Sequence, residues 1–172
     1  MRILITSDHA GFPLKGKLYQ YLKAEGYDVT DFGPHELDPD DDYPDYVAPV
    51  AESVSDGGDE VRGIIIGGSG QGEAMMANRY PHVRAAVFNG QFEPKDKRKV
   101  PDEIVLTRVH NDSNVLALGA RFINIEEAKE AVKKWLDTKF PSEARHERRI
   151  KKIEELSPKG QAEGNVKSII ID

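Results

Sequence analysis

The segment Val61-Arg-Gly-Ile-Ile-Ile-Gly-Gly-Ser-Gly-Gln-Gly-Glu73 indicates the class of fold more clearly than any other part of the chain. Residues 61–66 are almost wholly apolar, which is typical of a strand buried on both faces of a sheet. The glycines of residues 67–72 predict a tight turn, and Glu73 begins a predicted helix that runs to Arg79. A buried strand that leads through a turn into a helix is the repeating unit of a parallel α/β sheet.

The same alternation of strand and helix continues on both sides of this segment. Further strands are predicted at residues 2–7, 27–32, 84–88 and 115–119, and further helices around residues 14–22, 46–54, 128–136 and 142–156. Residues 89–101 are predicted to form a polar loop, and Trp135, Met75 and Met76 are expected in the core. We therefore predict one α/β domain over residues 1–156, with a five-stranded parallel sheet, and a C-terminal tail over residues 157–172.

Composition excludes several classes of protein. Among 172 residues, 30 acidic side chains outnumber 24 basic ones, and an acidic chain disfavours non-specific binding to nucleic acid or to an anionic membrane. No apolar run is long enough to span a bilayer. The chain has no cysteine, which excludes disulfides, thiolate metal sites and a cysteine nucleophile. The N-terminal residues lack the pattern of a signal peptide, so the cytoplasm is the expected location.

The glycine-rich turn fits neither of two common phosphate-binding motifs. A nucleoside-triphosphate loop needs Lys-Ser or Lys-Thr after its last glycine, where this chain has Glu73-Ala74. Gly68, Gly70 and Gly72 do not have the spacing of a dinucleotide-binding loop. A carboxylate beside the turn would repel phosphate, so the turn suits a neutral group that becomes an oxyanion during a reaction. The alternative is a plain tight turn followed by a solvated Glu73.

Other polar residues follow or precede the predicted strands. In parallel α/β sheets, ligands bind at the carboxyl ends of the strands, and we expect Asp8-His9, residues 67–73 and the segment near His110 to lie there. Asp8 as a helix cap beside a surface His9, and an ordinary turn at His110-Asn111-Asp112, are the alternatives.

Two charged clusters have a simpler reading as solvated surface. Arg145 and Arg149 are four residues apart on one helical face, where they form either a phosphate clamp or a solvated basic face. The acidic run Asp38-Pro-Asp-Asp-Asp42 lacks the glycine and the closing glutamate of a calcium loop, and is predicted to be a solvated loop.

Taken together, these segments resemble the ribose-5-phosphate isomerase B family, which includes galactose-6-phosphate and allose-6-phosphate isomerases. The resemblance runs from Ile3 to about Ile153. Its matching residues are Ser7-Asp8-His9-Ala10-Gly11-Phe12, Leu14-Lys15, Asp31-Phe32-Gly33, Asp42-Tyr43-Pro44-Asp45-Tyr46, residues 63–72, Ala77-Asn78-Arg79, Val83-Arg84-Ala85-Ala86, residues 110–121, Arg145-His146 and Arg149.

The resemblance implies a three-layer α/β/α Rossmann-like fold and aldose–ketose isomerisation of a phosphosugar without metal, cofactor, nucleic acid or membrane. It also implies a homodimer or a dimer of dimers whose site is shared between two subunits. By position, His9, Arg121, Arg145 and Arg149 would hold the phosphate, and Asp8, Tyr43 and Asn111 would contact the sugar. His110 would assist ring opening as an acid. Ser69 and the N–H groups of Gly68, Gly70, Gln71 and Gly72 would form the oxyanion hole.

The sequence departs from the family pattern in two places. Many members carry a cysteine base just before the glycine loop, where this chain has Gly67, whereas another branch has glycine there and a glutamate after the loop. The resemblance therefore implies Glu73 as the base. Residues 88–110 are also longer than usual, and we expect the segment Asn89–Thr107, with Lys95, Lys97, Arg98 and Lys99, to set substrate choice.

The alternative functions differ either in the substrate or in the class of protein. A pentose 5-phosphate is the first substrate to test and a hexose 6-phosphate the second. A non-catalytic phosphosugar-binding protein would need neither Glu73 nor His110, and a nucleotide-binding regulator is disfavoured by the failed phosphate motifs.

Overall fold

A computed structural model describes residues 1–92, 95 and 102–157, which fall into two compact units, the first ending at Phe140 and the second beginning at Pro141. The strands of the first unit are β1 (Arg2–Ser7), β2 (Val29–Asp31), β3 (Val61–Gly67), β4 (Ala85–Phe88) and β5 (Val115–Gly119). Its helices are α1 (Phe12–Ala24), α2 (Tyr43–Gly57), the short η1 (Gly58–Glu60), α3 (Gln71–Ala77), α4 (Glu103–Asn111) and α5 (Ile125–Asp137). The second unit contains α6 (Ala144–Leu156). The single domain over residues 1–156 stays a prediction, and the predicted tail beyond Ser157 lies outside the described residues.

The strands form one parallel sheet in the order β2-β1-β3-β5-β4, which confirms the predicted fold class. Ser7 at the end of β1 pairs with Ile66, and Gly67 at the end of β3 pairs with Gly119. The chain leaves β1 toward β2 on one side, and β3 lies on the other side. In such sheets a ligand usually binds beyond the carboxyl ends of the two strands at this reversal, which are β1 and β3 here.

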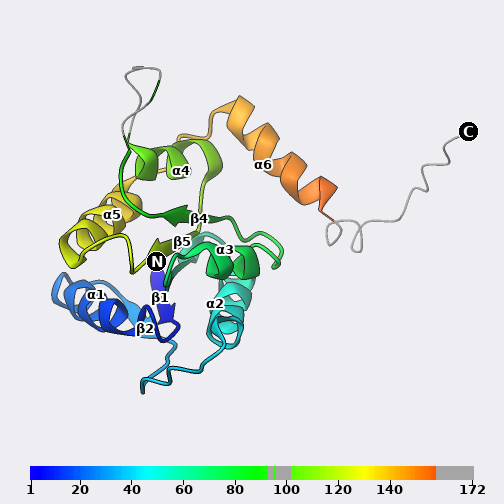
Figure 1. Ribbon diagram of the computed structural model, residues 1–172. Coiled ribbons are helices and arrows are strands. Elements are labelled where there is room, and N and C mark those ends of the chain that lie inside the picture. The colour runs from blue at the N-terminus through cyan, green and yellow to red at the C-terminus, as the bar shows by residue number, and fades with distance from the viewer. Residues whose placement is uncertain (93–94, 96–101, 158–172) are drawn as a thin grey trace, which may run out of the picture. The chain divides into compact units, whose positions relative to one another are not determined.

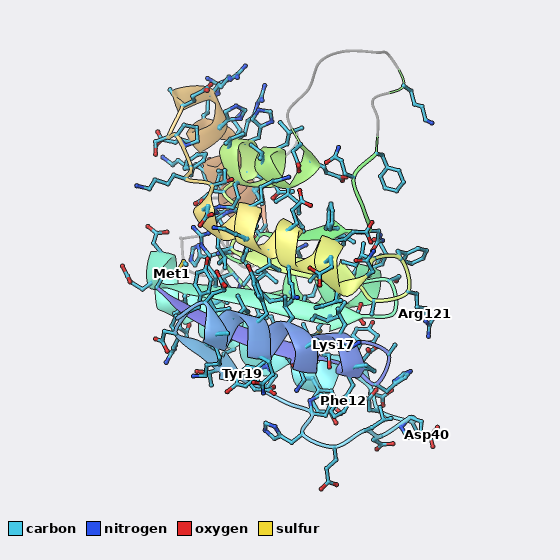
Figure 2. The ribbon with its side chains drawn as sticks, turned by 90° about the vertical axis from the view of Figure 1, so that its left-hand side faces the viewer. Met1, Phe12, Lys17, Tyr19, Asp40 and Arg121 are labelled. Carbon is cyan, nitrogen blue, oxygen red and sulfur yellow. The ribbon has the colours of Figure 1, made fainter. Side chains whose placement is uncertain are left out.

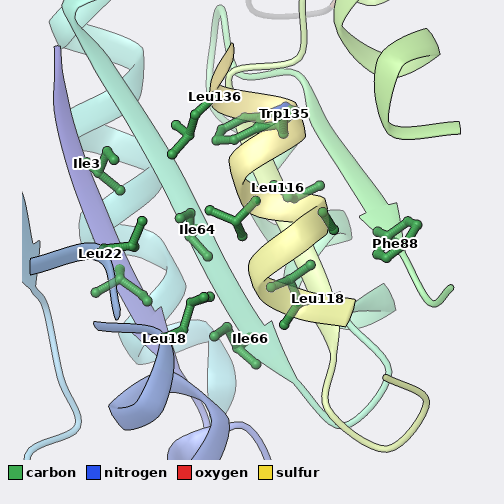
Figure 3. Packing of buried hydrophobic residues seen from close by; sticks show 14 of the residues in the cluster. Ile3, Leu18, Leu22, Ile64, Ile66, Phe88, Leu116, Leu118, Trp135 and Leu136 are labelled. Carbon is green, nitrogen blue, oxygen red and sulfur yellow. The ribbon is translucent and has the colours of Figure 1, made fainter. Parts of the chain in front are cut away.

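Helices cover both faces of the sheet, as Figure 1 shows for α1 and α5 on one face and for α2 and α3 on the other. Alternate residues of each strand point to opposite faces. Ile3 packs with Ile64, Leu116 and Trp135 under α1 and α5 (Figure 3), whereas Leu4 packs in the second cluster under α2 and α3. The sheet is thus the middle layer of three, and its carboxyl edge is left for the site.

Of the three side chains predicted to lie in the core, only that of Met75 lies outside it. Trp135 is fully buried as predicted, and Met76 is packed against the second cluster. Met75 is 66% exposed, so its predicted place in the core is wrong. The buried face of α3 consists of Glu73, Ala74 and Ala77, which leaves Met75 on the outward side.

Helix α4 was not predicted, because residues 89–101 read as a loop and residues 110–112 as a turn. The helix begins after Asp102, whose side chain accepts a hydrogen bond from the Ile104 N–H. Its buried positions are Ile104 and Arg108, and a buried arginine interrupts the apolar spacing by which helices are recognised. Lys97, Arg98 and Lys99 lie outside the described residues.

A buried ion pair connects α1 to the last residue of β2. Lys15 is 2% exposed, and its Nζ donates to both carboxylate oxygens of Asp31, at 2.7 and 2.9 Å, and to the Pro34 carbonyl at 2.7 Å. All three donors of the ammonium group are therefore satisfied, which removes most of the penalty for burying the charge. This contact fixes the start of the loop that leads to the acidic run. Among the described helices, none is long and apolar enough to cross a membrane.

Candidate active site

The glycine loop 67–72 lies at the carboxyl end of β3 and is held by backbone hydrogen bonds. The N–H groups of Ala120 and Arg121 donate to the carbonyls of Gly67 and Gly68, at 2.8 and 3.1 Å. Gly70 has a φ of 72°, a left-handed conformation that favours glycine. The loop between β3 and α3 is therefore fixed by the segment that follows β5.

Three glycines of this loop make room for three polar side chains. A Cβ at Gly67 would lie 1.8 Å from Oε1 of Glu73, and a Cβ at Gly68 would lie 2.9 Å from Cζ of Arg121. A Cβ at Gly72 would lie 2.9 Å from Cζ of Tyr43. The structure thus brings Tyr43, Glu73 and Arg121 to one loop from three different elements.

The carboxyl group of Glu73 fills the space that a side chain at position 67 would occupy. Glu73 is 4% exposed, and burial raises its pKa, against a smaller opposing effect of the hydrogen bond from its own backbone N–H. The Asp8 carboxyl raises the pKa further, through charge repulsion and a shared hydrogen bond. Among these influences on the pKa of Glu73, burial is the largest, so the alternative of a solvated Glu73 is wrong.

Asp8 is the second buried carboxyl at this edge, 7% exposed. Its Oδ1 accepts a hydrogen bond from the Gly11 N–H at 2.8 Å. A Cβ at Gly11 would lie 2.2 Å from the Ile66 carbonyl oxygen, so the turn after β1 passes close against β3. Asp8 and Glu73 therefore lie close enough to interact at the carboxyl ends of β1 and β3.

His9 contacts Asp41, a member of the acidic run that was not predicted to be a site residue. His9 Nδ1 lies 2.6 Å from Oδ1 of Asp41, whose side chain is only 2% exposed. The prediction of a solvated loop for the acidic run is thus wrong at Asp41. Figure 2 shows Asp40 and Arg121 at the side of the molecule away from Met1, the residue before β1. The acidic run therefore belongs to the carboxyl edge of the sheet.

His110 and Asn111 do not join this cluster within one chain. They end α4, before the amino end of β5, where the Asn114 N–H donates to the Arg84 carbonyl and the Gly63 N–H to the Asn114 carbonyl. From Gly63 to Gly67 the sheet extends about 13 Å at roughly 3.3 Å per residue. The expectation that the His110 segment lies at the carboxyl ends is wrong, because α4 returns the chain to the opposite edge.

The turn that carries His110 and Asn111 is held rigidly by two arginines. Arg84 donates to the carbonyls of Asn111 and Asp112, at 3.1 and 2.9 Å, and pairs with the Asp112 carboxylate at 2.9 Å. Arg108 pairs with the other oxygen of Asp112 at 2.7 Å and donates to the Ser113 carbonyl at 2.6 Å. Asn111 is exposed and His110 half-buried, so this turn presents both at the surface.

The remaining predicted residues lie on the glycine loop and on α6. Ser69 is half-buried, and its Oγ accepts a long hydrogen bond, 3.4 Å, from the exposed Gln71. Arg145 and Arg149 are both exposed and one helical turn apart in the second unit, where Arg145 pairs with Glu143 at 2.9 Å. Within the parts of the chain that the structure describes, no three His, Asp or Glu side chains form a cluster suited to a metal ion.

Gly67→Ala is expected to lower kcat on the order of 10²-fold, because a methyl group there displaces the Glu73 carboxyl by roughly 1 Å. The protein should still fold, since the displaced atoms end a flexible side chain. Steady-state kinetics and thermal unfolding would measure both effects. Gly16→Ala is the matched control, because nothing lies within 4 Å of that added methyl. Equal activity of the two variants would contradict the geometry.

The fold and the cluster of buried and exposed polar groups at its carboxyl edge fit an enzyme of the α/β class, and comparison with known proteins specifies the family. The chain belongs to the Ribose/Galactose Isomerase family, whose sequence model matches residues 3–153. It is 37% identical over 151 residues to the probable ribose-5-phosphate isomerase B of Mycoplasma genitalium, covering 88% of this chain and 92% of that protein. It is 35% identical over 152 residues to ribose-5-phosphate isomerase B of Escherichia coli, covering 88% and 93%.

Solved structures agree with this assignment. The crystal structure of the Mycoplasma genitalium enzyme with bound ribulose-5-phosphate has a TM-score of 0.79 and 38% identity, covering 88% of this chain and 93% of that one. Ribose-5-phosphate isomerase B of Clostridium thermocellum has a TM-score of 0.77 and 39% identity, covering 95% and 97%. These likenesses confirm the resemblance and the Rossmann-like fold.

Proposed function

We propose that this protein interconverts ribose 5-phosphate and ribulose 5-phosphate, with Glu73 as the proton-transfer base. The observation that carries the proposal is the buried Glu73 carboxyl, which fills the space beside Gly67 at the glycine loop. The raised pKa of Glu73 suits a base that must take up and release one proton near neutral pH. Because phosphorylated sugars are charged and retained in cells, we place this activity in the cytoplasm.

The reaction moves one proton between adjacent carbons of the opened sugar. Glu73 takes the proton from C2, and the electrons of the C2–H bond form a C1–C2 double bond as negative charge develops on O1. The N–H groups of Gly68, Gly70, Gln71 and Gly72 and the Ser69 hydroxyl stabilise this enediolate, at about 3 kcal/mol for a good donor. A proton passes from O2 to O1, and Glu73 returns its proton to C1, which gives the ketose.

The remaining residues bind the substrate. His9 and Arg121, which interact electrostatically at the carboxyl edge, hold the phosphate together with Arg145 and Arg149. Asp8 and Tyr43 contact the sugar beside the loop, and Asn111 does so from its exposed turn. His110 donates a proton during ring opening.

The positions of His110 and Glu73 support a site built from two subunits. In one chain these residues lie at opposite edges of the sheet. His110 and Asn111 of a second copy would complete the site of the first, and the reverse, in a homodimer or a dimer of dimers.

Arg149→Ala is expected to weaken phosphosugar binding by about 1.5–3 kcal/mol, the range for a hydrogen bond to a charged group. Titration calorimetry with ribose 5-phosphate would measure the change. Arg148→Ala removes the same charge from the neighbouring exposed position of α6 and should leave the affinity within about twofold. Equal losses in the two variants would show that only the net charge of α6 matters.

A turnover assay across phosphosugars tests the proposed substrate. We expect kcat/KM to be largest for ribose 5-phosphate, compared with galactose 6-phosphate and allose 6-phosphate. A hexose 6-phosphate is the second candidate, because the long segment Asn89–Thr107 is expected to set substrate choice. A larger kcat/KM for a hexose phosphate would change the substrate and keep the reaction, whereas no turnover of any phosphosugar would reject the proposed function.

A further inference from the structure

The contact between His9 and Asp41 is the feature that the proposed chemistry does not use. Asp41 belongs to the acidic run before α2, yet its side chain is 2% exposed while that of His9 is 35% exposed. Oδ1 of Asp41 lies 2.6 Å from His9 Nδ1, and its Oδ2 is buried without a hydrogen-bond partner. The carboxyl therefore has its main polar contact with one ring nitrogen of His9.

This geometry restricts what the other ring nitrogen of His9 can do. Because Nδ1 carries its proton toward Asp41, a neutral imidazole leaves a lone pair on Nε2. A lone pair repels the oxygens of a phosphate, so Nε2 can bind an anion only when the ring is the doubly protonated imidazolium. Binding of phosphate by His9 therefore requires a group that keeps the ring charged.

We propose that Asp41 is a positioning residue that holds His9 as an imidazolium oriented with Nε2 toward the substrate's phosphate. The inference rests on the proposed function only for the identity of the anion. Asp41 is suited to the role because its buried carboxylate stabilises the ring charge, while the ring of His9 stays partly exposed to a ligand.

Taken together, the groups around His9 raise its pKa. The hydrogen bond to Asp41 is the largest influence and raises the pKa of His9, against the opposing effect of burial. The charge of Asp8, after β1, also raises the pKa, and Arg121, after β5, lowers it. A bound anion would neutralise the effect of Arg121 and favour the imidazolium further.

The direct test is the pKa of His9 in Asp41→Asn, measured by NMR of the imidazole C–H groups without any ligand. His9→Gln assigns the His9 signal among the five histidines. We expect the pKa of His9 to fall by about one unit or more, because an opposite charge is removed from hydrogen-bond distance. Asp40→Asn, which removes the same charge from an exposed position of the same loop, should leave it unchanged. An unchanged value in Asp41→Asn, or equal shifts in both variants, would overturn the proposal.

Anion affinity provides the second readout. Sulfate is a suitable probe because its charge is constant between about pH 6 and about pH 8, where histidine titrates. In Asp41→Asn the sulfate affinity should fall with rising pH more steeply than in the unmodified protein, by up to about tenfold per pH unit for one linked proton. In a His9→Gln background, Asp41→Asn should add no such pH dependence.

Each outcome of the two experiments decides a separate claim. A loss of affinity by the same factor at every pH would show that Asp41 only anchors its loop, and would overturn the proposal. Neither readout uses a sugar or turnover. A protein that isomerises no phosphosugar yet shows both shifts would therefore reject the proposed function and retain the role of Asp41.

Discussion

Glu73→Gln is expected to lower kcat by a factor on the order of 10²–10⁴, the usual contribution of a general base. Glutamine keeps the shape of the side chain and removes the group that accepts the proton. The KM for ribose 5-phosphate should change little, because the residues proposed to hold the phosphate are others. Steady-state kinetics measures both constants. A kcat near that of the unmodified protein would show that another residue is the base.

Thermal unfolding distinguishes loss of the base from loss of the fold. Because burial raises the pKa of Glu73 in the folded state, protonation of Glu73 stabilises the fold at low pH, and this stability is lost as pH rises through the raised pKa. The neutral Glu73→Gln variant does not lose this stability as pH rises. Its Tm at neutral pH should therefore exceed that of the unmodified protein. For the same reason, kcat/KM of the unmodified enzyme should fall on the acid side at a pH above the ordinary glutamate pKa.

Mixing two inactive variants, Glu73→Gln and His110→Ala, is expected to restore about one quarter of full activity. In a random mixture half of the dimers contain one chain of each kind, and each such dimer has one site with both residues intact. Activity assays after co-expression or subunit exchange would measure the recovery. A mixture of Glu73→Gln with Gly67→Ala should recover nothing, because both changes affect the same half of the site. No recovery in the first mixture would place Glu73 and His110 in one chain's site.

The strands and most helices were predictable because their signals are local. β1, β3 and β5 are apolar runs bounded by polar or glycine-rich turns, and a sheet covered on both faces is the arrangement that such runs favour. Helix α4 was missed because the buried position at Arg108 holds a charged side chain. That arginine is stabilised by Asp112 and the Ser113 carbonyl, partners that no periodicity reveals.

The part of the candidate site that follows the ends of neighbouring strands could be predicted from the sequence. Asp8, His9 and Glu73 follow β1 and β3, whose pairing brings them together, and the glycines make the close approach of Tyr43 and Arg121 possible. Asp41 was missed because an acidic run is usually solvated, and burial of one member depends on the distant His9. His110 was predicted at the wrong edge of the sheet. Its position depends on helix α4, which was not predicted and which returns the chain across the sheet before β5.

Deuterium exchange at C2 of ribose 5-phosphate tests the central claim most directly, since it follows the proton that Glu73 is proposed to move. The protein is incubated with ribose 5-phosphate in D₂O, and NMR follows deuterium entering C2 of the aldose. We expect the unmodified protein to introduce deuterium at C2 while ribulose 5-phosphate forms, and Glu73→Gln to reduce both rates together, by a factor on the order of 10²–10⁴. C2 exchange by Glu73→Gln at a rate close to that of the unmodified protein would contradict the account.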